Sequence, residues 1–390
     1  MTGPKRLMVL LGSMGAGGAE HQVLQLLRHI DRKRFVPHLY LMERRGEWLD
    51  RIPDDVPVAS YWPEHPPPRV YVPGRILCQQ AQDVRRHVEQ WRIDRIYDRT
   101  SQMTLTAYLA GRPKQTARLS VAAGDPQREF QKAHRRFALV KRWLLRRAYH
   151  DADRVIAVCE AVRQGLVRFF GLPPDHVVTL YPIVDRHEVA LRADEFVPER
   201  DPNSYYLVTV GRLEHEKGQR LLLEAMARLV HPNDPPPIRL WLIGSGPDEP
   251  ALKKLAVALR VENRVEFLGY RPNPLPWVKH ADLYCCPSHY EGMPNAVLEA
   301  MLCGTPVVAA DSPGGLAELL AHGRGLLVKP NTAGAWAQAI AAAREDLPRT
   351  RQKAIQAQQW ACSRFDADRQ VRRLEELLEN VDMPWPVDFV

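Results

Sequence analysis

The sequence contains no hydrophobic run of the ~18 residues that a membrane-spanning helix needs. An apolar stretch near its start, Leu7–Leu11, is followed at once by glycines. We therefore do not expect an integral membrane protein. Lys5 and Arg6 before this stretch resemble the start of a signal peptide. A short strand that enters a glycine-rich loop explains the segment better, so we expect mature sequence.

Cysteine is scarce and unpatterned. None of the six cysteines has a C-x-x-C spacing or partnered histidines, which predicts a reduced, cytoplasmic chain without a zinc site. The six are Cys78, Cys159, Cys285, Cys286, Cys303 and Cys362.

Two common phosphate-binding patterns are also missing. The cluster Gly12–Gly18 fails the dinucleotide pattern G-x-G-x-x-G, because Glu20 stands where the third glycine would follow Gly15 and Gly17. A later loop, Val210–Gly218, ends in Lys-Gly rather than the Gly-Lys-Ser/Thr of a P-loop. Neither an NAD site nor a P-loop is favoured.

What is present is a chain of 390 residues, 45% hydrophobic and 26% charged, long enough for two or three domains. Its net charge of +8 is uneven: residues 1–185 hold 30 Lys and Arg against 19 Asp and Glu, and the remainder holds 24 against 27. We expect the first half to meet an anionic partner. No nucleic-acid-binding motif occurs, so we do not expect that partner to be nucleic acid.

Short apolar runs alternate with segments of helical period, which is typical of β-α-β units and a parallel sheet. The pattern restarts after residues 181–202, where prolines interrupt helix and the charge balance changes. We expect two α/β domains and a final helix with an apolar stripe at about 366–380. The expected strands are Leu7–Leu11, His38–Met42, Arg95–Tyr97, Arg118–Val121, Arg154–Val158, Tyr205–Val210, Arg239–Ile243, Val265–Leu268, Leu283–Cys286 and Pro306–Ala309.

The loops after three of these strands are rich in glycine, which exposes backbone N–H groups, or carry cationic side chains. Gly12–Gly18 brings backbone N–H groups to a helix N-terminus, unless its glycines serve only a tight turn. After Gly211, Arg212 and Lys217 are five residues apart and can converge on one diphosphate. The alternative is solvated loop charge paired with neighbouring glutamates. Gly244 opens a further bare loop at the same edge of the sheet.

Two glutamates accompany a helix after the strand at 283–286. Pro294 suits the first helical position and Gly304 a C-cap, which predicts a helix over about 294–302. Glu291 then lies in the loop before the helix and can accept hydrogen bonds from sugar hydroxyls, whereas Glu299 lies inside it and can accept them from a ribose. The N–H groups at the helix start can hold phosphate or sugar oxygens. For two glutamates alone, a surface position is the alternative.

Together these motifs resemble retaining glycosyltransferases of family 4, which have the GT-B fold. The matching segments are G-G-A-E at Gly17–Glu20, G-R-L-x-x-x-K-G at Gly211–Gly218, G-x-G-P at Gly244–Pro247, E-x(7)-E at Glu291–Glu299 and G-G-x-x-E at Gly314–Glu318. The resemblance implies two Rossmann-like domains facing a central cleft. Residues 1–185 would bind the acceptor, with 366–390 crossing back onto them, and residues 186–365 would bind a nucleotide-sugar donor. It also implies no metal and no other cofactor.

Carried over residue by residue, the resemblance implies that Arg212 and Lys217 bind the donor diphosphate. Glu299 would bind the ribose, and Glu291 the transferred sugar. Residues after the strand at 265–268 would face the base, and the first glycine cluster would approach from the other domain. The implied catalytic residues are Arg212, Lys217 and Glu291. The implied donor-binding residues are Gly17, Gly18, Gly211, Gly244, Tyr270, Arg271, Gly292, Met293, Pro294, Asn295 and Glu299.

Some segments depart from this pattern. Many relatives carry a histidine after a strand of the first domain, where this chain has Ser120–Asp125. That function is absent, or it has moved to Asp125, our acceptor-side candidate. Asp151–Asp153 and Asp366–Asp368 spell the D-x-D of metal-dependent glycosyltransferases. One precedes an expected strand and the other opens a helix, so we expect both to be structural.

We therefore expect a retaining enzyme that moves a hexose or N-acetylhexosamine from a nucleotide-diphosphate sugar, with UDP favoured, to a lipid-linked or polysaccharide acceptor in cell-surface glycan synthesis. Retention without a nearby nucleophile predicts a front-face transfer in which the departing diphosphate receives the acceptor's proton. A nucleotide-sugar epimerase and a non-catalytic sugar-nucleotide-binding protein on the same fold are the alternatives.

Residues 128–147 hold eight Lys or Arg interleaved with apolar side chains. Such a stretch can lie on anionic lipid, which would place a cytoplasmic enzyme peripherally on the inner face of the membrane. The alternative is a basic helix whose apolar side packs within its own domain.

Overall fold

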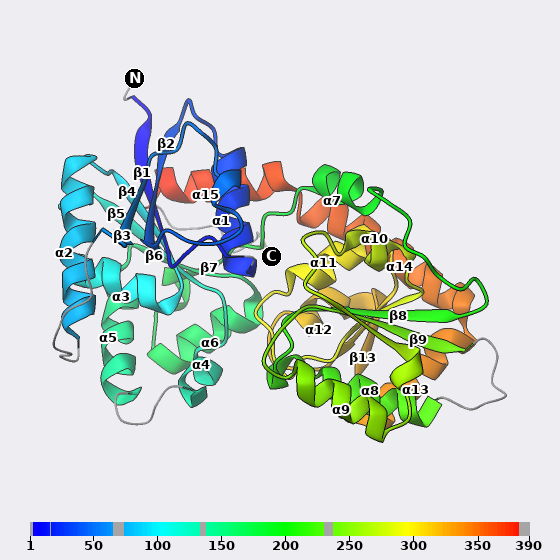
Figure 1. The fold of residues 1–390 in the computed structure, drawn as a ribbon. Helices are drawn as coiled ribbons and strands as arrows, with labels where there is room; N and C mark the ends of the chain where they lie inside the picture. The colour runs from blue at the N-terminus through cyan, green and yellow to red at the C-terminus, as the bar shows by residue number, and fades with distance from the viewer. Residues whose placement is uncertain (1–2, 16, 65–73, 133–137, 230–236, 382–390) are drawn as a thin grey trace. The chain divides into compact units, whose positions relative to one another are not determined.

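The computed structural model describes residues 3–15, 17–64, 74–132, 138–229 and 237–381. The chain divides into two compact units. The first unit comprises the described residues up to Ile183 together with those from Ala367 onward, and the second comprises Val184–Asp366. Figure 1 shows each unit as a twisted sheet with helices on both faces. The expected pair of α/β domains is therefore confirmed.

The first unit is built on a seven-stranded parallel sheet in the order β3-β2-β1-β4-β5-β6-β7. Helices α2, α3 and α5 cover one face, and α1 and α15 the other (Figure 1). The strands are β1 (Lys5–Leu11), β2 (Phe35–Glu43), β3 (Val58–Trp62), β4 (Arg95–Arg99), β5 (Ala117–Ala122), β6 (Arg154–Ala157) and β7 (Val177–Thr179). The helices are α1 (Gly18–His29), α2 (Arg75–Gln90), α3 (Ser101–Ala110), α4 (Pro126–Lys132), α5 (Ala138–Asp151), α6 (Glu160–Phe170) and α15 (Ala367–Glu379), with short 3-10 turns at Leu49–Arg51 and Pro174–His176.

The second unit has a six-stranded parallel sheet in the order β10-β9-β8-β11-β12-β13. The strands are β8 (Tyr205–Val210), β9 (Ile238–Ile243), β10 (Val265–Gly269), β11 (Leu283–Cys286), β12 (Val307–Ala310) and β13 (Leu326–Val328). The helices are α7 (Arg186–Ala193), α8 (Gln219–Leu229), α9 (Glu249–Ala258), α10 (Leu275–His280), α11 (Asn295–Leu302), α12 (Leu316–Leu320), α13 (Ala333–Glu345) and α14 (Leu347–Arg364). Three 3-10 turns lie at His215–Lys217, Glu262–Arg264 and Ala321–Gly323.

The central strands are apolar because helices bury both faces of each sheet. Leu7–Leu11 of β1 are at most 1% exposed, and Leu207 and Val208 of β8 are fully buried. Each central strand runs into a loop at the carboxyl edge of its sheet, where open α/β sheets bind ligands. Buried apolar strands thus leave the chemistry to the loops that follow them.

Helix α15 returns the end of the chain to the first unit, as the sequence predicts. Its apolar stripe is buried. Arg34 forms ion pairs with Glu375 at 2.5 Å and with Glu379 at 2.7 Å on this helix. Glu375 is almost fully buried. Its ion pair with Arg34 therefore joins α15 to the first unit in addition to the apolar contacts of the helix.

None of the helices in the described part of the chain combines the length and the apolar character needed to span a bilayer.

Candidate functional site

Four loops meet at the carboxyl edge of the second sheet, because they follow the adjacent strands β9, β8, β11 and β12. Backbone hydrogen bonds join them. Leu213 N donates to Ser245 O at 2.9 Å, His289 N donates to Glu216 O at 2.8 Å, and Gly315 N donates to Gly292 O at 2.7 Å. The motif segments that lie far apart in the sequence therefore form one connected surface.

Lys217 and Glu291 form an ion pair in which Nζ lies 2.6 Å from Oε1. Their side chains are 26% and 13% exposed. The hydroxyl of Ser288, which is buried, donates to the same carboxylate oxygen at 2.7 Å. Burial lowers the pKa of Lys217, but the adjacent Glu291 carboxylate raises it by more, so the net pKa lies above its ordinary value. The Glu291 carboxylate thus lies between two donors, and it keeps the ammonium group of Lys217 charged.

Arg212 is largely exposed. Its Nη1 lies 2.8 Å from Glu214 Oε1, and its side chain is 71% exposed. This is the pairing with a neighbouring glutamate that the sequence left as the alternative. The charge of Arg212 still acts on Lys217, whose pKa it lowers. The two cations are therefore close enough to interact electrostatically, although only Lys217 contacts Glu291.

Glu299 lies in α11 and faces α7 rather than Lys217. Burial raises the pKa of its carboxyl group to about 7; nearby Arg192 lowers it and Glu188 raises it. Burial raises the pKa of the Tyr284 phenol most, and Cys286, Glu299 and Glu291 raise it further. The two glutamates thus act on one buried tyrosine from two elements.

Two glycines allow the loops to approach one another. Gly244 has φ +142°, and a Cβ atom there would lie 1.9 Å from the carbonyl oxygen of Gly211. Gly314 has φ +118°, and its Cβ would lie 1.6 Å from the carbonyl oxygen of Glu291. Only glycine fits both the backbone angle and the space at these positions.

The start of α11 differs by one residue from the prediction. The helix begins at Asn295, so Pro294 is the N-cap rather than the first helical residue, and Gly304 follows the C-cap Cys303 with φ +74°. Met293 and Pro294 are buried, and Gly292 and Asn295 are partly exposed.

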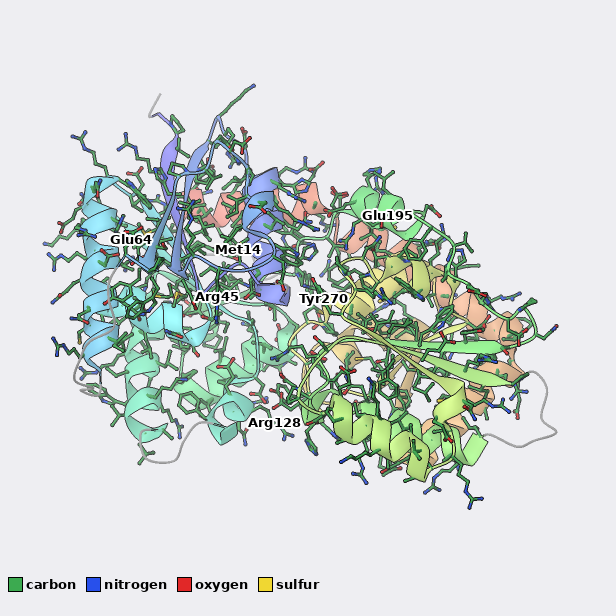
Figure 2. The ribbon with its side chains drawn as sticks, viewed as in Figure 1. Met14, Arg45, Glu64, Arg128, Glu195 and Tyr270 are labelled. Atoms are coloured by element: carbon green, nitrogen blue, oxygen red, sulfur yellow. The ribbon has the colours of Figure 1, made fainter. Side chains whose placement is uncertain are left out.

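The base-facing candidates follow β10. Gly269 O accepts from Gly244 N at 2.9 Å, which ties this loop to the edge described above. Tyr270 is 43% exposed (Figure 2), and the guanidinium of Arg271 lies 5.4 Å from the centre of the Trp277 ring.

In the first unit, the loop between β1 and α1 is fixed by a neighbouring loop. Met14 N donates to Arg45 O at 2.9 Å, and both residues are labelled in Figure 2. Gly17 is the N-cap of α1, which begins at Gly18. The Glu20 carboxylate folds over Gly17, with Oε2 2.3 Å from where a Cβ would stand.

Asp125, the acceptor-side candidate, precedes α4. Its Oδ1 accepts from Gln127 N at 3.0 Å, and its carbonyl oxygen accepts from Arg128 N and Glu129 N at 3.1 Å. The residue therefore caps α4.

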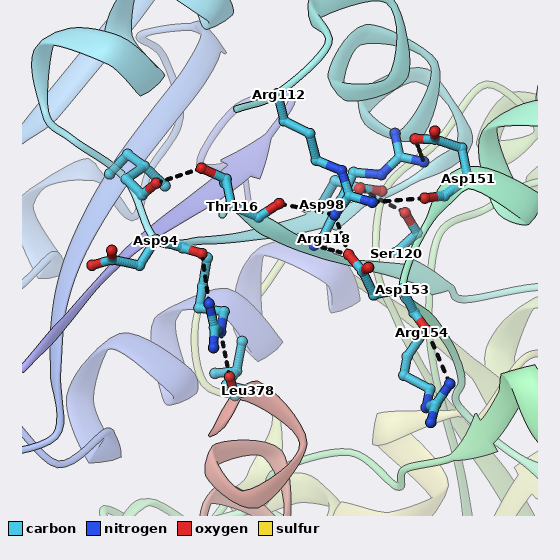
Figure 3. A network of polar contacts seen from close by, with 12 residues as sticks. Asp94, Asp98, Arg112, Thr116, Arg118, Ser120, Asp151, Asp153, Arg154 and Leu378 are labelled. Atoms are coloured by element: carbon cyan, nitrogen blue, oxygen red, sulfur yellow. Dashed lines mark hydrogen bonds and ion pairs between the residues drawn. The ribbon is translucent and has the colours of Figure 1, made fainter. Parts of the chain in front are cut away.

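The two D-x-D segments have structural partners, as expected. Asp151 lies 3.2 Å from Arg118 Nη2, and Asp153 pairs with Arg112 and accepts from Arg118 N (Figure 3). Asp366 forms a parallel β-bridge with Val184, and its Oδ2 lies 3.8 Å from Arg186 Nε. Within the described ranges, no group of three or more His, Cys, Asp or Glu side chains could hold a metal ion.

Sequence reasoning missed a second set of contacts between the Lys217 loop and the Glu291 loop. The imidazole rings of His215 and His289 stack with centres 5.3 Å apart, and Tyr290 Oη donates to Glu216 Oε2 at 3.0 Å. Each partner is within two residues of Lys217 or Glu291. Their place beside motif residues is the signal that could have revealed them.

Two family models cover most of the chain. Residues 16–188 match the model described as Glycosyltransferase Family 4, and residues 192–361 match the model described as Glycosyl transferases group 1. Their boundary falls close to the division between the two units.

Some curated relatives match most of the chain, and others match about half of it. An N-acetylgalactosamine-N,N'-diacetylbacillosaminyl-diphospho-undecaprenol 4-alpha-N-acetylgalactosaminyltransferase of Campylobacter jejuni is 26% identical over 88% of this chain and 91% of its own length. A D-inositol 3-phosphate glycosyltransferase of Pseudarthrobacter chlorophenolicus is 34% identical over 57% of this chain, which spans 55% of that enzyme.

Solved structures match nearly the whole chain. HepE of Anabaena in complex with UDP is 25% identical, with a TM-score of 0.76, over 96% of this chain and 99% of that one. WaaG, a glycosyltransferase involved in lipopolysaccharide biosynthesis, is 16% identical with a TM-score of 0.74, over 96% of this chain and all of that one. The latter likeness shows the fold alone, which is GT-B.

Proposed function

The chain belongs to glycosyltransferase family 4 and is a retaining glycosyltransferase, and from that premise we propose that it moves a hexose or N-acetylhexosamine from a UDP-sugar to a lipid-linked glycan. The observation that carries the proposal is the Lys217–Glu291 pair at the carboxyl edge of the second sheet. In this pair, the Lys217 ammonium can bind a diphosphate, and the adjacent Glu291 carboxylate can accept hydrogen bonds from sugar hydroxyls.

We propose that Lys217 and Arg212, rather than a metal ion, neutralise the donor diphosphate. A guanidinium and an ammonium can share its oxygens, and both stabilise the charge that grows as the glycosidic bond breaks. The proton of the acceptor hydroxyl would pass to the departing diphosphate on the same face of the sugar. The chain's contribution is then positioning and electrostatic stabilisation.

Glu291 and Glu299 receive different roles in this proposal. Glu291 accepts hydrogen bonds from hydroxyls of the transferred sugar, and the backbone N–H groups of Gly292, Met293 and Asn295 donate to its oxygens. Glu299 accepts hydrogen bonds from the ribose. Gly211 and Gly244 let the diphosphate approach the backbone, and Tyr270 and Arg271 face the base. Gly17 and Gly18 of the first unit are kept as donor-binding candidates. Asp125 is kept as the acceptor-side candidate.

Relatives support the choice of donor and acceptor. HepE is described in complex with UDP, and the Campylobacter enzyme is named for a diphospho-undecaprenol acceptor. All six cysteines are free, which supports a reducing compartment such as the cytoplasm.

We also propose that α5 lies on an anionic membrane surface. Leu139, Val140 and Trp143 are 80%, 56% and 50% exposed, while Leu145 and Tyr149 further along the helix are buried. The helix carries four Lys or Arg, and Arg128 lies in α4 before it (Figure 2). Its C-terminal half thus packs within the first unit, while its N-terminal half offers apolar and basic side chains to a lipid surface. Residues 133–137 of the predicted basic stretch lie outside the described residues.

A donor screen followed by a transfer assay tests this function. We expect thermal unfolding to shift upward with UDP more than with GDP or ADP; a ligand at about 100 times its dissociation constant adds ~2.7 kcal/mol of stability. With the matching UDP-sugar and an undecaprenyl-diphosphate-linked sugar, we expect a product with the donor's anomeric configuration. Slow donor hydrolysis without any glycosylated product would instead support a sugar-nucleotide-binding protein, and a changed sugar without an acceptor would support an epimerase.

A further inference from the structure

Arg99 is a buried cation that lacks an anionic partner. It is the last residue of β4 and is 7% exposed. Its Nη1 donates to Tyr97 Oη at 3.4 Å, and its Nε, also buried, has no hydrogen-bond partner. No acidic side chain in the described part of the chain forms an ion pair with it. Burying a guanidinium in this way is costly unless a ligand completes its contacts.

The other buried arginine of the same sheet has an acidic partner. Arg118 on β5 is fully buried, and its Nη2 lies 3.2 Å from Asp151 (Figure 3). The same nitrogen donates to the carbonyl of Ala148. Burial lowers the pKa of Arg118, and the nearby Asp98 carboxylate acts against that shift. An acid therefore lies beside Arg118, although its Nε and Nη1 have no hydrogen-bond partner, whereas no acidic side chain within the described residues forms an ion pair with Arg99.

Arg99 lies at the carboxyl edge of the sheet, next to the first glycine loop. The register pairs Leu10 with Asp98 and Val121 with Arg99, so Arg99 lies between the ends of β1 and β5. Side chains alternate along β4: Arg95 reaches Leu378 of α15, whereas Asp98 accepts from Thr104 of α3.

Arg99 therefore shares the face of the sheet with α15 and α1, at the edge where α1 begins. This is the edge at which open α/β sheets bind ligands.

The backbone after Arg99 is strained. Thr100 has φ +90° and ψ 148°, a conformation that residues other than glycine seldom adopt, and it is the N-cap of α3. Such strain persists where the surrounding structure over-determines it, commonly at ligand sites. It fixes the turn that carries Arg99 at the sheet edge.

We propose that Arg99 binds a phosphate group of a substrate at the carboxyl edge of the first sheet. A buried guanidinium with free donors matches the oxygens of a phosphate, which accepts several charge-assisted hydrogen bonds. The proposed function supplies two sources, the donor diphosphate and the phosphate of a lipid-linked acceptor. Phosphate binding by Arg99 does not depend on the proposed function. The choice between the donor and the acceptor as the source of the phosphate does.

Titration of inorganic pyrophosphate tests the site without reference to either substrate. Lys217→Ala serves as the background, because it weakens the proposed site in the second unit. Adding Arg99→Met should weaken the remaining pyrophosphate binding about 10- to 100-fold in calorimetry, as expected for the loss of a charged hydrogen-bond donor. An unchanged affinity would overturn the proposal.

The stability of the unliganded variants provides a second readout. Arg95→Met is the matched control, because Arg95 lies on the same strand and face but bonds the carbonyls of Leu378 and Asp94. In phosphate-free buffer, Arg95→Met should lower the unfolding temperature, whereas Arg99→Met should leave it unchanged or raise it. An equal loss in both variants would mean that Arg99 is structural and would overturn the proposal.

The source of the phosphate follows from two further measurements on Arg99→Met. A weaker affinity for UDP assigns the group to the donor. An unchanged UDP affinity with a raised KM for the acceptor assigns it to the acceptor. If the protein showed no transfer at all, the proposed function would fail while the pyrophosphate result still decided the role of Arg99.

Discussion

Glu291 shares its carboxylate between Lys217 and Ser288 in the unliganded protein. In the proposed mechanism, a donor that approaches Lys217 must therefore compete with, or add to, an existing ion pair. The pair would keep the cation charged and in place before the diphosphate binds, which would lower the reorganisation needed in the transition state. It also separates two roles that mutation can distinguish.

Glu291→Gln should keep UDP binding and lose transfer. The amide no longer pairs with Lys217 as an anion, so the affinity for UDP should stay the same or rise. It holds the sugar hydroxyls less well, so we expect kcat to fall about 10²- to 10³-fold, as for other lost polar contacts in a transition state. Calorimetry and a transfer assay measure the two effects. A parallel loss of UDP binding would contradict the separate roles.

Glu299 should make both stability and donor binding depend on pH. Its pKa is about 7 in the folded protein against an ordinary 4.5. Its contribution to stability is therefore fully present below pH 4.5 and lost as the pH rises through 7. Glu299→Gln, which stays neutral, should be more stable than the wild type above pH 7 and should match it near pH 4.5.

UDP binding by the wild type should change in the opposite direction. A ribose needs the ionised carboxylate, so the affinity should rise up to about tenfold between pH 6 and pH 8 as Glu299 ionises. Calorimetry at both values, with Glu299→Gln as the control for ionisation of UDP itself, measures this. The same pH dependence in both proteins would contradict the ribose assignment.

At the residue scale, the sequence could propose candidate site residues but not the contacts between them. Spacing alone could not show that Lys217 and Glu291, 74 positions apart, form an ion pair, because only the sheet order brings their loops together. Nor could it show that Arg212 pairs with Glu214 at the surface. Arg99 gave no sequence signal, since an arginine at the end of a strand is ordinary until its burial is known.

At the scale of elements, the loop after β12 supports the loop that carries Glu291. Gly314 allows this contact because it has no side chain: a Cβ would lie 1.6 Å from the Glu291 carbonyl oxygen. Glu291 N also donates to Pro313 O at 3.1 Å. The position of the carboxylate therefore depends on a glycine in a different loop.

Gly314→Ala should displace Glu291 and lower transfer about 100-fold, because a shift of ~1 Å at the chemistry commonly costs that much. Gly323→Ala is the matched control. It also has a positive φ, of +78°, but nothing lies within 4 Å of its Cβ position. It should show only the stability loss of strained backbone, about 1–3 kcal/mol. Equal activity in both variants would contradict the supporting role of Gly314.

Apolar strands in the interior of each sheet and amphipathic helices were predictable, whereas the three-residue edge strands were not. β1, β8 and β11 lie where hydrophobic runs predict them. β7 and β13 have three residues each, too few for a pattern to emerge, and they exist because a neighbouring strand offers hydrogen bonds. Pro294 was misplaced by one position because the first N–H groups of a helix lack helical partners, so proline is tolerated at either residue.

At the scale of the whole molecule, positive charge and exposed apolar side chains coincide in the first unit. Arg147 lies over the Trp143 ring at 4.0 Å, so the tryptophan is held at the surface beside a cation. Aromatic and basic side chains in this arrangement suit the interface of an anionic bilayer.

Trp143→Ala should weaken binding to vesicles rich in anionic lipid about tenfold, since it removes a large buried apolar contact from the bound state. Flotation of vesicles with the protein measures this. Leu191→Ala in α7, where the side chain is 76% exposed, is the control and should bind as the wild type does. Failure of the wild type to float with anionic vesicles would remove the membrane proposal.

Binding of UDP to Lys217→Ala tests the central claim most directly. The account predicts that this variant stays folded and binds UDP about 10- to 100-fold more weakly than the wild type in calorimetry, because a charged partner of the diphosphate is lost. Lys253→Ala, whose lysine pairs with Glu249 at 2.7 Å on α9, should bind UDP normally. Wild-type affinity for UDP in Lys217→Ala would contradict the account.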